Sequence, residues 1–355
     1  MNAFGYESSE KNSDWNAEAI EKIGNICNTV NAPYIEELKS GAWKLSFQEI
    51  NHIRHDPENA DKYLSFRFDF YKSLTTFPDD ETSAFPLYSV IEPTSICNLR
   101  CVMCFQQDKR LKESPFRGTM TMETYENAID QLKEIGVKAI TFAGRGEPFI
   151  NKNFPAFLDY ASGKFLEIKI NTNGLLMTEE IARAILRNNV DMVVFSVEGT
   201  NQKEYELTRV GGSFDKLINN IKMFNELKKE YPNSNTLTRV SGVLVKEIDK
   251  EEYYSFWREY VDEATLGQCE ERSDTYNNAE VIKKAPCRRL WQRTYVWWNG
   301  DCSPCDVDYL EKLKFGNLND NSLKSIWNGT TIRQFRREHL DGNRKECIPC
   351  DRCQE

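Results

Sequence analysis

Apolar stretches alternate along the middle of the chain with amphipathic stretches that have helical spacing. Six apolar segments predict strands: "PLYSVI", "VKAITFA", "FLEIKI", "VDMVVFS", "TLTRVSGVLV" and "DEATLG". Between them, the spacing of apolar positions predicts helices near residues 121–136, 153–162, 178–189, 213–230 and 249–258. This alternation is typical of a parallel β/α assembly, in which ligands bind at the carboxyl ends of the strands.

The two flanks have different patterns. The first 85 residues are charged and have helical spacing, as in "AEAIEKIGNICNTV", and they contain no recognised binding motif, so we expect a helical segment beside the β/α region. From about residue 266 the chain is polar, and "TYVWW" followed by "NG" predicts a hairpin. We therefore expect three parts, at residues 1–85, 86–265 and 266–355.

Composition and charge exclude several classes of protein. The chain has 355 residues with a net charge of −9 and no basic cluster, which argues against a nucleic-acid surface. Its longest apolar runs are far shorter than the roughly 20 residues that span a bilayer, and no secretory signal is visible. We expect a cytoplasmic protein without a membrane partner. Its 11 cysteines then favour metal binding over disulfides.

Three of the cysteines lie within eight residues, in the stretch "CNLRCVMC" that follows the first predicted strand. They are Cys97, Cys101 and Cys104, with the spacing C-x3-C-x2-C. Three thiolates on one loop bind three irons of a 4Fe-4S cluster and leave the fourth iron open. Structural zinc is the alternative, but it requires four protein ligands, and no fourth Cys or His lies near this stretch.

The array resembles the signature of the radical S-adenosylmethionine (SAM) enzymes. In that family SAM binds the open iron, and its reductive cleavage gives a 5'-deoxyadenosyl radical that abstracts a hydrogen atom from the substrate. The resemblance implies an α/β fold, namely an open (β/α)6 TIM-like partial barrel. It also implies a 4Fe-4S cluster and SAM as cofactors, and a one-electron donor such as flavodoxin or ferredoxin.

Polar motifs at the predicted strand ends extend the resemblance. "GRGEP" is similar to the Gly-Gly-Glu-Pro motif of the family, with Arg145 in place of the first glycine, and "NTNG" and "SVEG" follow the next two strands. Taken singly, each motif is also compatible with an ordinary turn or a solvated side chain. The residues that the resemblance implies as SAM contacts are Gly146, Glu147, Asn171, Asn173, Ser196, Glu198 and Arg209.

The adenine contact departs from the family pattern. The family usually has an aromatic residue just before the third cysteine, where this chain has Met103, and Phe105 lies just after that cysteine. A thioether also packs on aromatic rings. We therefore expect Met103 and Phe105 near the adenine.

The C-terminal cysteines are similar to those of the SPASM/twitch extension of radical SAM enzymes, which binds an auxiliary cluster. The resemblance implies a second 4Fe-4S cluster on Cys287, Cys305, Cys347 and Cys350, with Cys353 or Cys302 as possible substitutes. Structural zinc is the alternative, because four thiolates in paired groups suit that metal. A metal is physically reasonable in a segment with little apolar periodicity.

The reaction and the substrate are less determined. Without a recognisable peptide-binding module, we expect a radical SAM oxidoreductase or epimerase acting on a polar, carbohydrate-like small molecule. The alternatives are a peptide-modifying maturase and, in another class, a non-catalytic zinc or iron-sulfur regulatory protein. Epimerisation needs a thiol hydrogen donor, for which Cys302, and after it Cys269, is our candidate. Spare cysteines are more often small buried residues.

Overall fold

The structure is a computed structural model that describes residues 7–9, 24, 33–76, 78–113, 115–245, 247–269, 275–281 and 285–353. Its strands form one ten-stranded sheet with the order β1-β7-β6-β5-β4-β3-β2-β8-β9-β10. The strands are β1 (Glu7–Ser9), β2 (Tyr88–Ile91), β3 (Ala139–Phe142), β4 (Glu167–Thr172), β5 (Met192–Ser196), β6 (Leu237–Leu244), β7 (Glu263–Gln268), β8 (Arg293–Val296), β9 (Asp301–Ser303) and β10 (Gly316–Asn317).

The six strands β2 to β7 are parallel and coincide with the six predicted strands. They alternate with α5 (Met122–Ile135), α6 (Phe154–Ala161), α7 (Glu179–Arg187), α8 (Gln202–Thr208), α9 (Phe214–Lys228) and α10 (Lys250–Trp257). The sheet does not close on itself, which confirms the predicted partial barrel. Only α8 was not predicted, because its seven residues are too few to show a periodic pattern.

Helix α5 shows how local sequence sets the bounds of these elements. The Thr121 hydroxyl accepts a hydrogen bond from the Thr124 amide at 3.1 Å, and Gly136 ends the helix with φ +98°. Both are the predicted capping roles. The apolar face of the helix is fully buried against the outer face of the sheet, so the helices and the outer face share one core.

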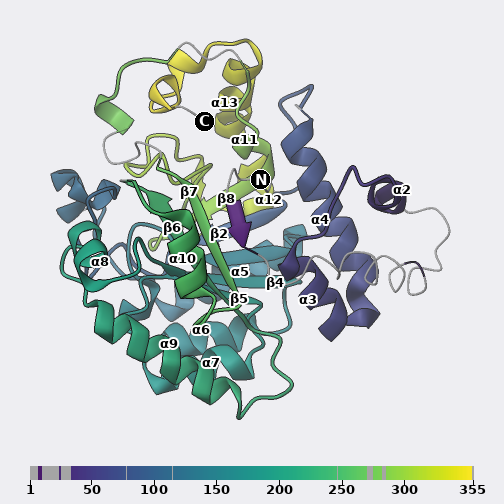
Figure 1. The fold of residues 1–355 in the computed structure, drawn as a ribbon. Helices are drawn as coiled ribbons and strands as arrows, with labels where there is room; N and C mark the ends of the chain where they lie inside the picture. The colour runs from purple at the N-terminus through teal and green to yellow at the C-terminus, as the bar shows by residue number, and fades with distance from the viewer. Residues whose placement is uncertain are drawn as a thin grey trace.

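Three helices of the N-terminal part lie at the amino ends of β4 and β5. They are α2 (Pro33–Lys39), α3 (Phe47–His55) and α4 (Ala60–Thr75), drawn in purple and dark blue in Figure 1. Nδ1 of His52 in α3 lies 2.8 Å from Oδ1 of Asp191, which immediately precedes β5. The Tyr63 hydroxyl of α4 donates to Glu167 at 3.2 Å. Strand β1 pairs antiparallel with β7.

The C-terminal segment continues the barrel sheet. Strand β8 pairs parallel with β2, and β8 with β9 forms the predicted hairpin around Gly300, whose φ is +85°. Helices α11 (Arg289–Gln292), α12 (Leu323–Trp327) and α13 (Thr330–Leu340) complete this part, at the yellow end of the chain in Figure 1. The predicted boundary after residue 265 falls inside β7. None of the helices in the described ranges is long and apolar enough to span a bilayer.

Candidate active site

The first three cysteines lie on a loop that leaves the carboxyl end of β2. Cys101 is buried, and Cys97 and Cys104 are half-buried. Backbone amides point at two of the sulfurs, because Leu99 N lies 3.5 Å from Cys97 Sγ and Gln106 N lies 3.4 Å from Cys104 Sγ. N–H donors aimed at sulfur stabilise a thiolate, which is the form that binds iron.

The environment of the thiols fits a metal cluster in a second way. Burial is the main cause that raises the pKa of Cys97 to about 11 and that of Cys104 to about 12, and the Cys101 thiol contributes to both values. Thiols with such pKa values stay protonated at neutral pH unless a metal replaces the proton. The residues therefore fit the cluster that the C-x3-C-x2-C spacing predicts.

Glu147 and its neighbours join the loops after β3 and β4. Its carboxylate accepts hydrogen bonds from the Thr172 hydroxyl at 2.6 Å and from the Asn173 amide at 2.7 Å. Burial raises the pKa of Glu147 to about 7, although these bonds lower it. The Asn173 side chain in turn donates to Asn98, the residue after the first cysteine, at 2.8 Å. Two loops predicted to contact SAM thus lie against the cysteine loop.

Gly146 is required by packing. A Cβ at this position would lie 2.2 Å from the carbonyl oxygen of Thr94 and 2.5 Å from that of Ile96. Separations this short do not occur between real atoms, so a side chain here would push the cysteine loop away. Glu147 N also donates to Ile96 O at 2.9 Å. The glycine therefore lets the two loops touch through their backbones.

Glu198 and Arg209 form a buried ion pair beside the second cysteine. The Arg209 guanidinium donates to both oxygens of Glu198, at 2.5 and 2.7 Å, and its Nη1 lies 3.6 Å from Cys101 Sγ. Burial alone would lower the pKa of Arg209, but Glu198 holds it above its ordinary value. The pair holds a guanidinium next to Cys101, a predicted cluster ligand, and a guanidinium at this point would also suit the carboxylate of a ligand.

The remaining predicted contacts have mixed outcomes. Asn171 on β4 is exposed, Ser196 on β5 is half-buried, and both alternate with residues of the outer core, so they face the barrel interior. Met103 is half-buried on the cysteine loop. Phe105 is 9% exposed and stacks on Tyr309 of the C-terminal segment, with ring centroids 5.2 Å apart, so protein covers one face of its ring.

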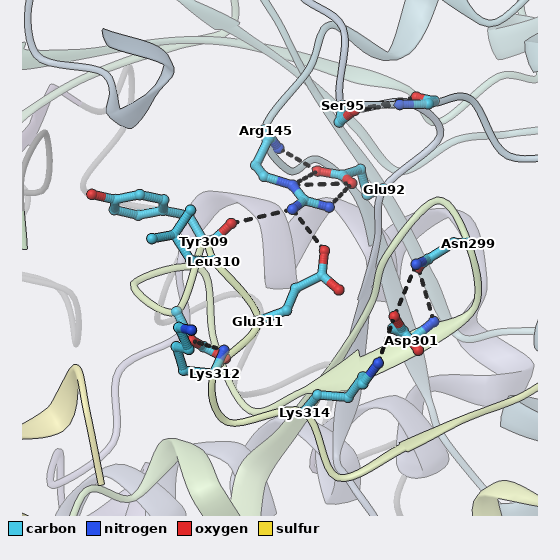
Figure 2. Close-up of polar contacts among 12 residues, drawn as sticks. Glu92, Ser95, Arg145, Asn299, Asp301, Tyr309, Leu310, Glu311, Lys312 and Lys314 are labelled. Atoms are coloured by element: carbon cyan, nitrogen blue, oxygen red, sulfur yellow. Dashed lines mark hydrogen bonds and ion pairs between the residues drawn. The ribbon is translucent and has the colours of Figure 1, made fainter. Parts of the chain in front are cut away.

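Sequence reasoning missed the role of Arg145. Its guanidinium and backbone amide bond to Glu92, and its Nη1 reaches Glu311 at 2.8 Å, as Figure 2 shows. Neither carboxylate belongs to a recognised motif. The sequence contained one signal for this role, namely an Arg where the family motif has a glycine. A cation between two glycines of a buried loop requires a buried anion as its partner.

The C-terminal cysteines predicted as ligands lie together. Burial raises the pKa of Cys350 well above its ordinary value, and Cys305, Cys287 and Cys347 lie near enough to raise it too. Burial also raises the pKa of Cys305 and of Cys347 to about 12. Cys353 packs with Cys305 in a small apolar cluster, so it stays a possible substitute.

The two cysteines proposed as hydrogen donors have different surroundings. Cys302 on β9 is 0% exposed and belongs to the core on the outer face of the sheet, with burial raising its thiol pKa. A thiol enclosed there cannot reach a substrate inside the barrel, so our preference for Cys302 was wrong. Cys269 is half-buried and directly follows β7, at the carboxyl end of the barrel strands.

Comparison with known proteins gives the class that this fold and site define. Residues 91–252 match the family model of the radical SAM superfamily, and residues 287–354 match that of SPASM, an iron-sulfur cluster-binding domain. The chain belongs to the radical SAM superfamily and carries a C-terminal SPASM domain. This confirms the predicted class, the SAM-binding 4Fe-4S cluster, SAM itself and an auxiliary iron-sulfur cluster.

Individual relatives cover only part of the chain. The Fe-coproporphyrin III synthase of Methanosarcina barkeri is 32% identical over 122 residues, which are 34% of this chain and 30% of that protein. The subtilosin biosynthesis protein AlbA of Bacillus subtilis, named for an antilisterial bacteriocin, is 31% identical over 144 residues, which are 40% of this chain and 31% of that protein. The match thus spans about a third of the length of these curated relatives.

A solved structure resembles the fold over a longer stretch. Streptococcus suis SuiB, bound to the precursor peptide SuiA, has 19% sequence identity and a TM-score of 0.54. The likeness covers 78% of this chain and 71% of that chain. At this level of identity it establishes the shared fold.

Proposed function

We propose that this radical SAM enzyme is a maturase that modifies a peptide. The observation that carries the proposal is the pairing of β1 with β7, the last of the six parallel barrel strands, in which Glu7 lies opposite Leu266 and Ser9 opposite Ala264. The edge of the barrel sheet therefore accepts an extended chain through its backbone, which is how peptides add to sheets.

The direction of this pairing connects the edge to the active site. Strand β7 runs parallel to β2 through the sheet, so its carboxyl end lies at the same end of the barrel as the cysteine loop. A strand paired antiparallel with β7 leads its preceding residues toward that end. A peptide docked in place of β1 would thus present its N-terminal side to the cysteine loop.

The relatives support the same substrate class. AlbA is named for a bacteriocin, and SuiB was solved with its precursor peptide. Our sequence-based preference for a small molecule rested on the lack of a recognised peptide-binding module. An edge strand needs no separate module, which removes that objection.

The chemistry divides between the cofactors and the chain. When bound, the first cluster and SAM supply a carbon radical that removes a hydrogen atom from the substrate. The chain orients SAM through Glu147 and Arg209, and the loops around the cysteines keep water away. Oxidation of the substrate radical also needs an electron acceptor, and we assign that role to the cluster of the SPASM domain.

A polar small molecule is the second candidate, because part of the barrel interior is polar. Lys169, Asn171 and Arg239 alternate with outer-core residues on β4 and β6 and are half-buried or exposed, although both strands lie inside the sheet. Such side chains suit a carbohydrate-like molecule with many hydrogen-bonding groups. The name of the Methanosarcina relative also refers to a porphyrin rather than to a peptide.

Protease treatment of the substrate pool separates the two candidates. The reduced, anaerobic protein is incubated with SAM and a low-molecular-weight cell extract, and 5'-deoxyadenosine is measured. A peptide substrate predicts that the extract stimulates its formation and that prior protease digestion removes the stimulation. Stimulation that survives digestion supports the small molecule. A protein without iron and without SAM cleavage would instead fit the regulatory alternative.

Epimerisation of either substrate is tested at the two cysteines considered as hydrogen donors, Cys269 and Cys302. We propose Cys269 as the hydrogen donor in that case, because it lies at the carboxyl end of β7. Cys269→Ala should then abolish incorporation of solvent deuterium into the product, and Cys302→Ala serves as the matched control. Equal product labelling in both variants and in the wild type would rule out a cysteine donor.

A further inference from the structure

A short loop of the SPASM domain, residues 308–311, lies against the two loops that form the SAM site. It begins three residues after Cys305, which we assign to the auxiliary cluster. Asp308 shapes it by accepting hydrogen bonds from the amides of Lys312 at 2.7 Å and Leu313 at 2.8 Å. Glu311 has a φ of +56°, which a residue with a side chain adopts only when its surroundings hold it there.

Arg145 holds this loop from the side of the barrel. Its Nη1 donates to the carbonyl oxygen of Tyr309 at 3.2 Å and to Glu311 at 2.8 Å. Its Nε and Nη2 donate to Glu92, which follows β2, and the guanidinium lies 4.2 Å from the ring centroid of Trp297, which follows β8. Figure 2 shows the guanidinium between the two carboxylates. One side chain thus joins the ends of β2, β3 and β8 to the loop.

The cysteine loop holds the same segment at a second point. Phe105, next to Cys104, stacks on Tyr309 with an interplanar angle of 16°. The Tyr309 hydroxyl donates to Asp108 at 3.2 Å. Phe105 is adjacent to Cys104, a predicted ligand of the first cluster, and it contacts Tyr309, which lies four positions after Cys305, a proposed ligand of the second.

At this junction the buried negative groups outnumber the buried positive group. The side chains of Arg145 and Glu92 are 0% exposed and that of Glu311 is 9% exposed, so one guanidinium serves two enclosed carboxylates. A glycine at position 145, as in the family motif, would leave both carboxylates without a cation. Such an arrangement is strongly unfavourable in a protein interior.

We propose that Arg145 is a positioning residue that fixes the auxiliary-cluster domain on the SAM-site loops through residues 308–311. Arg145 belongs to the same five-residue motif as Glu147, so the motif has two functions. Glu147 faces the cofactor side, and Arg145 sets where the second cluster lies relative to the first. The proposal rests on the radical SAM class and is independent of the choice between peptide and small molecule.

Two variants of the cluster-loaded protein test the proposal at about pH 8, where Glu311 is charged. Arg145→Lys keeps a cation beside Glu92 but cannot bond to both carboxylates in the same way. Glu311→Gln leaves the pair of Arg145 and Glu92 intact and removes only the anion on the loop. Glu226→Gln, in an exposed ion pair with Lys229 on α9, is the matched control.

Two measurements are made on each variant: amide hydrogen exchange, and the magnetic coupling between the two reduced clusters by electron paramagnetic resonance. We expect exchange at the Lys312 and Leu313 amides to be about tenfold faster in both variants. The magnetic coupling between the two clusters should be spread over a broader range of values than in the wild type. The helices α6 and α7 should exchange as in the wild type. The control should match the wild type in both measurements.

Two results would overturn the proposal. One is unchanged exchange at residues 308–313 together with unchanged cluster coupling in both variants. The other is faster exchange spread evenly over the barrel helices, which would make Arg145 a residue of general stability. Iron content, measured on the same samples, shows that both clusters are present when the coupling is read. Neither result depends on the substrate, so the proposed function is tested separately.

Discussion

The two ends of the barrel both enclose a carboxylate, but they compensate its charge differently. At the amino end, Glu167 lies within 3.6 Å of Arg67 and 3.5 Å of Lys169, and these cations hold its pKa at about 2 despite burial. At the carboxyl end, the partners of Glu147 within the described part of the chain are a hydroxyl and backbone amides, and burial raises its pKa to about 7.

The difference teaches that burial alone does not distinguish a structural carboxylate from a functional one. The charge on the hydrogen-bonding partners distinguishes these two carboxylates, because a carboxylate held by neutral donors still lacks a counter-charge. For Glu167 the counter-charge belongs to the chain, as it does for Glu92 and Glu198 at the carboxyl end, which pair with Arg145 and Arg209. For Glu147 we expect it to come from the amino group of SAM.

The largest expected effect removes the function of the carboxyl end. Replacing Cys97, Cys101 and Cys104 with alanine should lower the iron content from about eight to about four per chain and abolish 5'-deoxyadenosine formation. Iron and sulfide analysis of the anaerobic protein checks it. A variant that keeps all its iron would mean that the cluster lies elsewhere.

The next largest effect concerns the amino end. Arg67→Met should lower the free energy of unfolding by about 3–5 kcal/mol, because it leaves Glu49 and Glu167 enclosed without that cation. Chemical denaturation measures this. SAM affinity of the folded fraction should stay as in the wild type, and a large loss of affinity would contradict the division of roles between the two ends.

A third effect depends on pH. Burial raises the pKa of Glu311 from 4.5 to about 7, so the folded chain keeps a proton that the unfolded chain releases between those values. The free energy of unfolding should therefore fall by at most about 3 kcal/mol as the pH rises from about 4.5 to about 7. Above about pH 7 the contribution of Glu311 should stay constant. Glu311→Gln should remove it from the unfolding profile, and an identical slope in the variant would contradict the assignment.

The smallest effect is the most specific. Glu147→Gln should weaken SAM binding about tenfold, equivalent to about 1.4 kcal/mol, and leave stability within about 1 kcal/mol of the wild type. Isothermal titration with SAM, beside a denaturation curve, measures both quantities. A loss of stability as large as that of Arg67→Met would show that Glu147 is a structural residue like Glu167.

Much of the fold could be predicted because the parallel strands and the longer helices have clear periodic signals. The caps at Thr121 and Gly136 act within a few residues of the helix, so the local sequence contained them. The cysteine loop is a local pattern in the same sense, because its three predicted ligands lie within eight residues.

The missed features depend on contacts between distant segments. Arg145 contacts Glu311, which lies 166 positions away in the sequence, and Phe105 contacts Tyr309, which is also far away in the sequence. No local pattern can therefore show either pair. Cys302 appeared spare because counting ligands says nothing about which face of a strand a residue occupies. Its neighbours on β9 place it in the core, and that required the register with β8.

The pairing of β8 with β2 has a consequence for how the chain can be shortened. Removing the SPASM domain would strip the neighbour from β2 and expose its row of backbone amides and carbonyls. A barrel cut in this way would offer an edge to other copies of itself and aggregate. The two halves are therefore best regarded as one folding unit, in which losing the second cluster's domain costs the solubility of the first.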